Sequence, residues 1–169
     1  MMRFGQLENE FQQCEKHLDE TGTRNTEIEN HLVRYLLIRI CAEYERRIDS
    51  LVQRRCGRIN DEYVLNFAKW GIEIATKRFR IENIIELLSR FGEDYQNTFK
   101  DALGKQTNKQ DWQVAWDNIV TNRHIVAHGR GPVMMTLTDL KGQYKISLRV
   151  IDEIVKSLQL REKDIAGLK

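Results

Sequence analysis

The sequence has little that would bend or interrupt a chain. Of its 169 residues, one is proline, Pro132, and ten are glycine. An all-β protein needs many short turns, and turns depend on these two residue types. The scarcity of both therefore argues against an all-β fold. Glu, Arg, Lys, Leu and Ile are plentiful instead, and these residues favour helices.

Cysteine and long apolar runs are also scarce. The three cysteines are far apart and odd in number (Cys14, Cys41 and Cys56), so they predict neither a disulfide framework nor a CxxC metal knuckle. No apolar run approaches the ~18 residues of a membrane-spanning helix. The N-terminus lacks the apolar core of a signal peptide. We therefore expect a cytoplasmic protein without membrane spans.

The chain also has no large excess of charge of either sign. The chain has 27 Lys and Arg against 25 Asp and Glu, a net charge of +2. No basic tail or block dominates, so composition alone gives no argument for nucleic-acid binding. The 41% hydrophobic content is sufficient for a core and excludes wholesale disorder. Without repeats, low-complexity tracts or linkers, we expect a single domain over residues 1–169.

Apolar side chains recur every three or four residues along most of the chain, which is the pattern of amphipathic helices. The predicted helices span about 4–20, 25–55, 61–90 with a break near 78–80, 95–103, a stretch from 111, and 138–160. Four or five main helices with short connections predict an all-α fold, an antiparallel helical bundle.

The second of these helices has two distinctive features. Thr26 and Glu29 have the spacing of a capping box, in which each side chain accepts a free backbone N–H at the helix start. Between Leu32 and Tyr44 the helix is apolar on most sides. Such a helix is usually central, or it lies at a subunit interface.

The segment 111–132, DWQVAWDNIVTNRHIVAHGRGP, contains an unusually placed charge. On an ideal helix Arg123 falls in the middle of an apolar side. That side consists of Trp112, Ala115, Trp116, Ile119, Val120, Val126 and Ala127. A guanidinium is costly to bury there unless it is paired or faces a wet cleft. Arg123 therefore indicates either an ion pair with an acid such as Glu43 or Glu45, or a site open to water.

Two histidines follow Arg123 on the same segment. His124 and His128 are four residues apart, so they lie one helical turn from each other. Arg123 and His128 are separated by about 140° on an ideal helix and do not share a face by spacing alone. Gly129 favours a helix end directly after His128, and a local distortion there would bring the guanidinium and the imidazole into one cleft. Arg130 adds a further positive charge.

Arginine and histidine together supply the chemistry for cleaving RNA. Arginine binds phosphate through a planar fork of donors, and histidine takes or gives a proton near neutral pH. A base that deprotonates the 2′-hydroxyl allows it to attack the adjacent phosphorus, and no metal is required. The His124–His128 spacing is also that of two helical zinc ligands. No Cys or acidic pair is placed to supply the third ligand, so we expect no metal.

The stretch RHIVAH, from Arg123 to His128, resembles the R-φ-x3-H signature of the HEPN superfamily, in which φ is Asn, Asp or His. His124 stands at φ. The upstream stretches IENIIELLSRFG and DYQNTFKDAL are similar to members of the RiboL-PSP group of HEPN domains. The resemblance covers about residues 30–160.

This resemblance implies an α-helical bundle, commonly a homodimer whose two motifs face each other. Many members are metal-independent endoribonucleases in toxin–antitoxin, phage-defence or RNA-processing systems. Transferred by residue, Arg123 would contact the scissile phosphate, and His128 would be the acid/base or activate the 2′-hydroxyl. His124 would orient these two groups, while Asn122 and Arg130 would bind RNA.

We therefore expect a metal-independent endoribonuclease without a cofactor, a toxin or defence effector that forms a homodimer. A nucleotidyltransferase-like protein is the kind of antitoxin that would accompany it. Additional positive charge for RNA could come from Arg46, Arg47, Arg54 or Arg55. The alternative is a non-catalytic HEPN-like helical module that binds a protein or a nucleotide.

Overall fold

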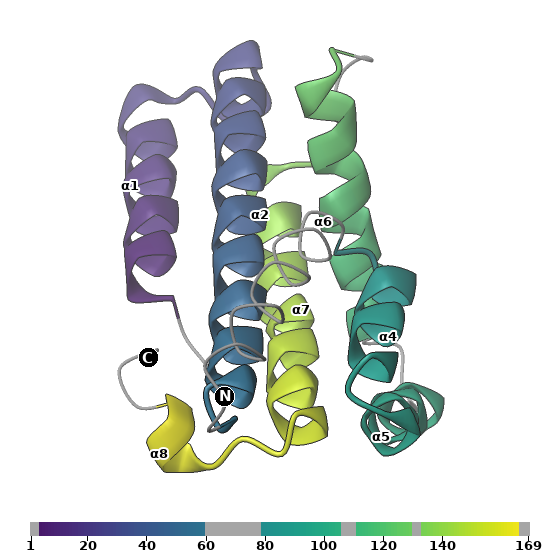
Figure 1. Cartoon of the computed structure of the whole chain (residues 1–169). Helices are drawn as coiled ribbons and strands as arrows, with labels where there is room; N and C mark the ends of the chain where they lie inside the picture. The colour runs from purple at the N-terminus through teal and green to yellow at the C-terminus, as the bar shows by residue number, and fades with distance from the viewer. Residues whose placement is uncertain (1–3, 60–78, 106–110, 130–132, 166–169) are drawn as a thin grey trace. The chain divides into compact units, whose positions relative to one another are not determined.

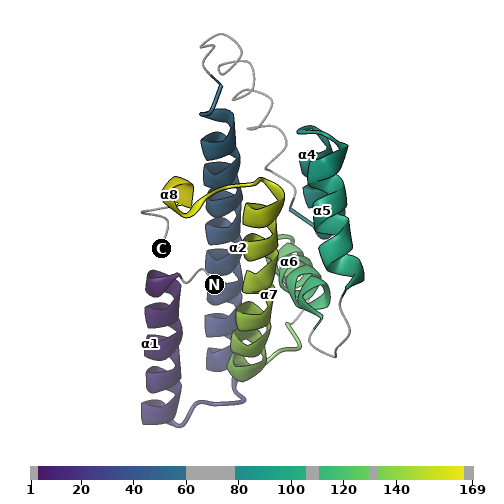
Figure 2. The same cartoon turned by 90° about the horizontal axis from the view of Figure 1, so that it is seen from below.

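The computed structural model describes residues 4–59, 79–105, 111–129 and 133–165, and the described residues form helices without strands (Figures 1 and 2). The predicted all-α fold is confirmed. Within the described ranges, no helix has the length and apolar character that crossing a bilayer requires. The helices are α1 (Gly5–Thr21), α2 (Glu27–Cys56), α4 (Ile81–Ser89), α5 (Glu93–Gly104), α6 (Trp112–Ala127), α7 (Leu137–Ser157) and α8 (Glu162–Ile165).

Most helix boundaries follow the local signals in the sequence. Gly22 ends α1 in the left-handed conformation, with φ 65°, which glycine adopts without strain. The predicted break near residues 78–80 agrees with the start of α4 at Ile81, while residues 60–78 of the same prediction lie outside the described part. The predicted end of the last helix at Leu160 is wrong. The chain leaves α7 after Ser157 because Gln159 takes a positive φ of 53°.

The capping box of α2 is present, with each contact displaced by one residue. The hydroxyl of Thr26 accepts the N–H of Ile28 at 3.2 Å, and the carboxylate of Glu29 accepts the N–H of Asn25 at 2.6 Å. Both contacts satisfy backbone donors that a helix start leaves without partners. Local sequence therefore fixes where α2 begins.

The chain divides into two compact units. The first unit comprises Met1–Glu43 and Gln110–Arg149, and the second comprises Tyr44–Lys109 and Val150–Lys169. The helices α2 and α7 each contribute residues to both units. The single domain over residues 1–169 stays a prediction.

The first unit contains α1, α6 and the first parts of α2 and α7. The guanidinium of Arg39 on α2 donates to the carboxylate of Glu10 on α1 at 2.8 Å, and the rings of Phe11 on α1 and Tyr144 on α7 have centroids 5.3 Å apart. Figures 1 and 2 show α1 and α6 on opposite sides of α2 and α7 in this unit. Its core includes Leu7, Leu18, Val33, Leu36, Leu37, Ile40, Trp116, Ile119, Leu137 and Leu140.

A buried carboxylate ties together the starts of α2 and α7. Glu29 is 5% exposed, and its second oxygen accepts the backbone N–H of Leu137 at 2.8 Å. The side-chain amide of Asn30 donates to the carbonyl of Val133 at 2.8 Å. These two contacts hold residues 133–137, which follow the end of α6 in the chain. The C-terminal side of the candidate site is therefore anchored to α2.

The second unit contains α4, α5, α8 and the last parts of α2 and α7. The helices α4 and α5 pack against each other. The guanidinium of Arg58 donates to the carboxylate of Asp164 at 2.5 Å, which attaches α8 to the residues that follow α2. The guanidinium of Arg55 lies 5.3 Å from the centre of the Tyr95 ring and donates to its hydroxyl.

Candidate active site

The candidate site lies at the C-terminal end of α6. The carboxylate of Asp111 caps the start of this helix by accepting the N–H groups of Gln113 and Val114 at 2.9 and 3.1 Å. The first part of the predicted apolar side is buried, as Trp112, Ala115, Trp116 and Ile119. Its later members are less covered: Val120 and Val126 are half-buried, and Ala127 is exposed. The helix is therefore fixed in the core at one end and reaches the surface at the other.

The helix ends where the sequence predicts. His128 is the C-cap, with φ −103° and ψ 7°, and its N–H donates to the carbonyl of His124 at 3.2 Å. Gly129 follows with φ 61°, and its N–H donates to the carbonyl of Val126 at 3.3 Å. A left-handed glycine directly after the C-cap is a common way to end a helix. The backbone therefore leaves helical geometry at His128, next to Gly129, where the sequence predicts the end of the helix.

The imidazole rings of the two histidines lie close together in a tilted arrangement. Their ring centroids are 4.3 Å apart and their planes are inclined by 57°. Both residues are exposed. Their four-residue spacing predicts this closeness, because residues one turn apart share a helix face. Two imidazoles are therefore presented to solvent at one end of α6.

Arg123 lies directly before this pair and is half-buried. It forms no hydrogen bond or ion pair with any residue that the structure describes. The alternative in which an acid such as Glu43 or Glu45 neutralises Arg123 is therefore not found among the described residues. No residue in the described ranges therefore occupies the N–H donors of its guanidinium.

Of the two residues expected to bind RNA, Asn122 and Arg130, only Asn122 lies in the described ranges. The side-chain amide of Asn122 donates to the carbonyl of Asn118 at 2.8 Å. This bond ties the amide nitrogen to the helix and leaves the amide oxygen as the group that could accept from a ligand. Arg130 lies outside the described residues. RNA binding by both residues stays a prediction.

Most of the four further arginines, at positions 46, 47, 54 and 55, are buried or contact other residues of the second unit. Arg47 is 3% exposed, and Arg54 donates to the carbonyl of Asp164 at 2.6 Å. Arg55 contacts Tyr95. Of the four, only Arg46 is exposed. Arg47 is therefore not one of the arginines that could supply charge to RNA, because it is buried and its guanidinium does not reach a polyanion at the surface.

The histidine pair does not form part of a larger metal-ligand cluster in the described ranges. No group of three or more His, Cys, Asp or Glu residues there is arranged to hold a metal ion. Structural and catalytic zinc sites use at least three protein ligands. The described arrangement instead combines a phosphate-binding fork with two groups that transfer protons near neutral pH.

Sequence reasoning missed the residue that anchors the segment after the site. Glu29 was expected only to cap its own helix, yet it also accepts the N–H of Leu137, 108 residues away. No local pattern contains that partner. The sequence signal for a buried Glu29 was its position just before the strongly apolar stretch that starts at Leu32.

The sequence profile of the RiboL-PSP-HEPN family matches residues 3–160. No curated protein matches the chain, and no solved structure matches it.

Proposed function

Because the chain belongs to the RiboL-PSP-HEPN family, we propose that it is a metal-independent endoribonuclease. One observation carries the proposal: Arg123 has no ionic partner among the described residues, and it directly precedes a solvent-exposed histidine pair at a helix end. A purely structural arginine on an apolar helix side would be expected to have a buried acidic partner. Arginine and histidine could serve several reactions, and the resemblance of RHIVAH to the HEPN signature favours RNA cleavage among them.

In the proposed reaction Arg123 binds the scissile phosphodiester. Its planar fork of N–H donors matches two non-bridging phosphate oxygens. Negative charge on these oxygens increases as the 2′-oxygen attacks, so the guanidinium binds the transition state more tightly than the substrate. Half-burial of Arg123 strengthens this interaction because it lowers the local dielectric constant.

His128 acts as the base in this proposal. Its imidazole takes the proton of the 2′-hydroxyl, and the 2′-oxygen forms a bond to phosphorus. The bond from phosphorus to the 5′-oxygen then breaks, and that oxygen takes up a proton. The products carry a 2′,3′-cyclic phosphate and a 5′-hydroxyl. His124, whose ring centroid lies 4.3 Å from that of His128, orients the base and the guanidinium.

We further propose that the protein acts as a homodimer. Support comes from the outer face of α2, where Ile28, Tyr35 and Ile38 are 44%, 48% and 47% exposed. They lie at positions i, i+7 and i+10, which share one side of a helix. Exposed apolar side chains that share one helix side are typical of association surfaces.

The proposed cellular role is that of a toxin or defence effector. A nucleotidyltransferase-like antitoxin is the proposed partner, as the HEPN resemblance implies. Expression of the chain alone should slow growth, and co-expression of an adjacent nucleotidyltransferase gene should restore growth. Normal growth in the presence of folded, accumulated protein would contradict this role.

The enzymatic proposal is tested on the ends of the products. Purified protein with total RNA in EDTA should give fragments with 2′,3′-cyclic phosphate and 5′-hydroxyl ends. These ends follow from attack by the 2′-oxygen, whereas metal-activated water leaves a phosphate on the other side of the break. Intact RNA in EDTA, with cleavage restored by added Mg²⁺ or Zn²⁺, would overturn the proposed mechanism.

A further inference from the structure

Two arginines of the first unit have no partner among the described residues: Arg34 on α2 and Arg123 on α6. Both are half-buried. The other arginines that the structure describes in this unit are used within the protein. Arg24 and Arg39 each pair with a carboxylate of α1, at 2.6 and 2.8 Å, and Arg149 also has an interaction. Partial burial costs an arginine some of its hydration, and an anion normally compensates for that loss.

The local sequence does not neutralise Arg34. Its neighbours on the surface of the helix are the residues three and four positions away. These residues are Asn30, His31, Leu37 and Ile38, and none of them carries a negative charge. The positive charge of Arg34 is therefore available to an anion from outside the helix.

Arg34 lies on the side of α2 that faces α6. Arg39, which pairs with Glu10 on α1, is five residues later and so lies about 140° around the helix from Arg34. Asn30 is one turn before Arg34, on the same side, and its amide donates to the carbonyl of Val133 at 2.8 Å. Val133 follows the end of α6 in the chain. Figures 1 and 2 show α1 and α6 on opposite sides of α2, which agrees with this placement.

Arg123 lies on the side of α6 that faces into the unit. It follows Trp116 by seven residues and Ile119 by four, spacings that share one helix face, and both of these residues are fully buried. Figures 1 and 2 show the start of α2 and the end of α6 at the same end of the unit. With a rise of ~1.5 Å per residue, Arg34 is about 10 Å from the start of α2 and Arg123 about 6 Å from the end of α6. The two arginines thus lie near the same end of two neighbouring helices.

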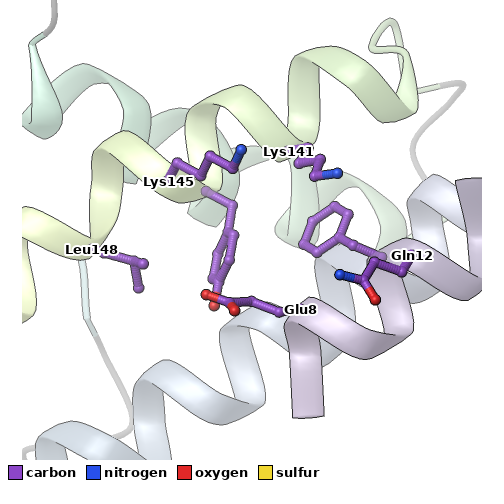
Figure 3. A pocket seen from close by; sticks show the side chains of 7 residues that line it. Glu8, Gln12, Lys141, Lys145 and Leu148 are labelled. Atoms are coloured by element: carbon purple, nitrogen blue, oxygen red, sulfur yellow. The ribbon is translucent and has the colours of Figure 1, made fainter. Parts of the chain in front are cut away.

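The opposite side of the unit does not suit a polyanion. A pocket of about 450 Å³ lies there between α1 and α7, and its basic residues are Lys141 and Lys145 (Figure 3). The amino group of Lys141 pairs with Glu15 at 2.6 Å, and Glu8 lines the same pocket. Two carboxylates therefore balance the two ammonium groups, and this side has no excess of positive charge for an RNA strand.

We propose that Arg34 binds the RNA phosphate next to the one that is cleaved. This inference rests on the proposed function, because it assigns Arg34 to the same RNA strand. The fork of Arg123 can occupy both non-bridging oxygens of the scissile phosphodiester, which leaves the neighbouring phosphate for a guanidinium on the adjacent helix. Since that phosphate does not react, Arg34 binds the substrate and the transition state about equally. Its loss should therefore weaken RNA binding more than it slows the cleavage of bound RNA.

Binding of an RNA that cannot be cleaved tests this assignment. A single strand of about 12 nucleotides, with 2′-fluoro groups throughout, has no 2′-hydroxyl to attack phosphorus. Arg34→Gln should raise its Kd at least about fivefold at about 0.1 M salt. The slope of log Kd against log salt concentration should fall by about 0.7, the contribution of one phosphate contact on a single strand. Arg34→Lys keeps the charge, so it should retain the wild-type slope.

Lys145→Gln is the matched control for Arg34→Gln. It removes one positive charge from an exposed position on the opposite side of the unit, and it should bind the RNA like the wild type. Equal weakening by Lys145→Gln and Arg34→Gln would mean that diffuse charge holds the RNA, and it would overturn the inference. Equal slopes for Arg34→Gln and the wild type would overturn it as well.

An ion pair with a second copy of the chain is the competing use of Arg34. Ile38, on the exposed outer face of α2, is one turn away. If Arg34 pairs across a dimer, Arg34→Gln should shift the protein to monomer in light scattering and leave the salt slope unchanged. That combination would refute a phosphate contact.

Cleavage assays separate this inference from the proposed function. On a cleavable RNA, Arg34→Gln should raise the RNA concentration that gives half the maximal rate by the same factor as the Kd. The single-turnover rate at saturating RNA should stay within about threefold of wild type. RNA binding that depends on Arg34, without cleavage by the wild type, would support the inference and refute the nuclease. Cleavage by the wild type, with binding unaffected in Arg34→Gln, would support the nuclease and refute the inference.

Discussion

The imidazole rings of His124 and His128 are 4.3 Å apart at the end of α6, with their planes inclined by 57°. The backbone joins the same two residues, because the N–H of His128 donates to the carbonyl of His124. His128 therefore holds its position although it has already left helical geometry. This arrangement suggests that His124 acts as a support for His128 and that its polarity matters more than its ability to carry a proton.

The role of His124 leads to a test by substitution. His124→Asn retains a polar side chain of the kind the HEPN signature allows, so RNA cleavage should stay within about tenfold of wild type. His124→Leu keeps the bulk but cannot make hydrogen bonds, and the rate should fall by about 100-fold or more. Single-turnover rates on one defined RNA measure both effects. Equal rates for the two variants would show that the position has no polar role.

The sequence predicted elements whose causes are local. The buried side of α1, the start of α6 near residue 111 and the helix end at Gly129 all depend on residues within one or two turns. The His124–His128 pair was predictable for the same reason. Contacts between distant segments were not predictable, and the link from Glu29 to Leu137 is one of them. The pocket beside Lys145 needs the relative placement of α1 and α7, which no single helical pattern contains.

The buried carboxylate of Glu29 should contribute strongly to stability. Glu29→Ala leaves the N–H groups of Asn25 and Leu137 without this acceptor, at a cost of about 1–3 kcal/mol. For a chain of this size, such a loss lowers the melting temperature by roughly 3–10 °C. Differential scanning fluorimetry measures the shift.

Glu27 provides the matched control for Glu29. It lies in the same first turn of α2, and its side chain is 89% exposed. Glu27→Ala should change the melting temperature by no more than about 2 °C, because exposed ion pairs contribute little. If the two alanine variants melt at the same temperature, the Glu29 contacts do not hold the starts of α2 and α7 together.

Asp164 should make the attachment of α8 sensitive to acid. The backbone N–H of Arg161, and then the guanidinium of Arg58, lower the pKa of Asp164 to about 2. Because the pKa is lowered in the folded state, the charged Asp164 stabilises the folded protein at pH values above the ordinary pKa of an Asp carboxyl. This stabilisation is lost as the pH falls through about 2. The amide signal of Arg161, which donates to Asp164 at 2.8 Å, should titrate over this range in NMR spectra.

Asp164→Asn should reproduce the acid effect at neutral pH. It removes the charge that Arg58 and Arg161 contact, so the Arg161 amide should exchange faster with solvent. Asp101→Asn, an exposed position on α5, controls for the loss of one negative charge. Unchanged exchange in Asp164→Asn would mean that these contacts do not attach α8.

The proposed homodimer predicts a specific effect of charge on the outer face of α2. Tyr35→Glu with Ile38→Glu should give a monomer in light scattering with size-exclusion chromatography, whereas wild type should give a dimer. Both side chains are about half exposed, so the double variant should remain folded. Val114→Glu, at an exposed apolar residue of α6, should remain dimeric. A monomeric wild type at micromolar concentration would contradict the proposal.

The rate of RNA cleavage in EDTA decides whether Arg123 and His128 carry the proposed activity. Relative to wild type, His128→Ala should lower the single-turnover rate by about 10²–10⁴-fold and Arg123→Ala by about 10²–10³-fold, with unchanged circular dichroism. His17→Ala and Arg90→Ala, which alter exposed residues elsewhere, should cleave at the wild-type rate. Cleavage at the wild-type rate by folded His128→Ala would show that this imidazole is not the base of the reaction.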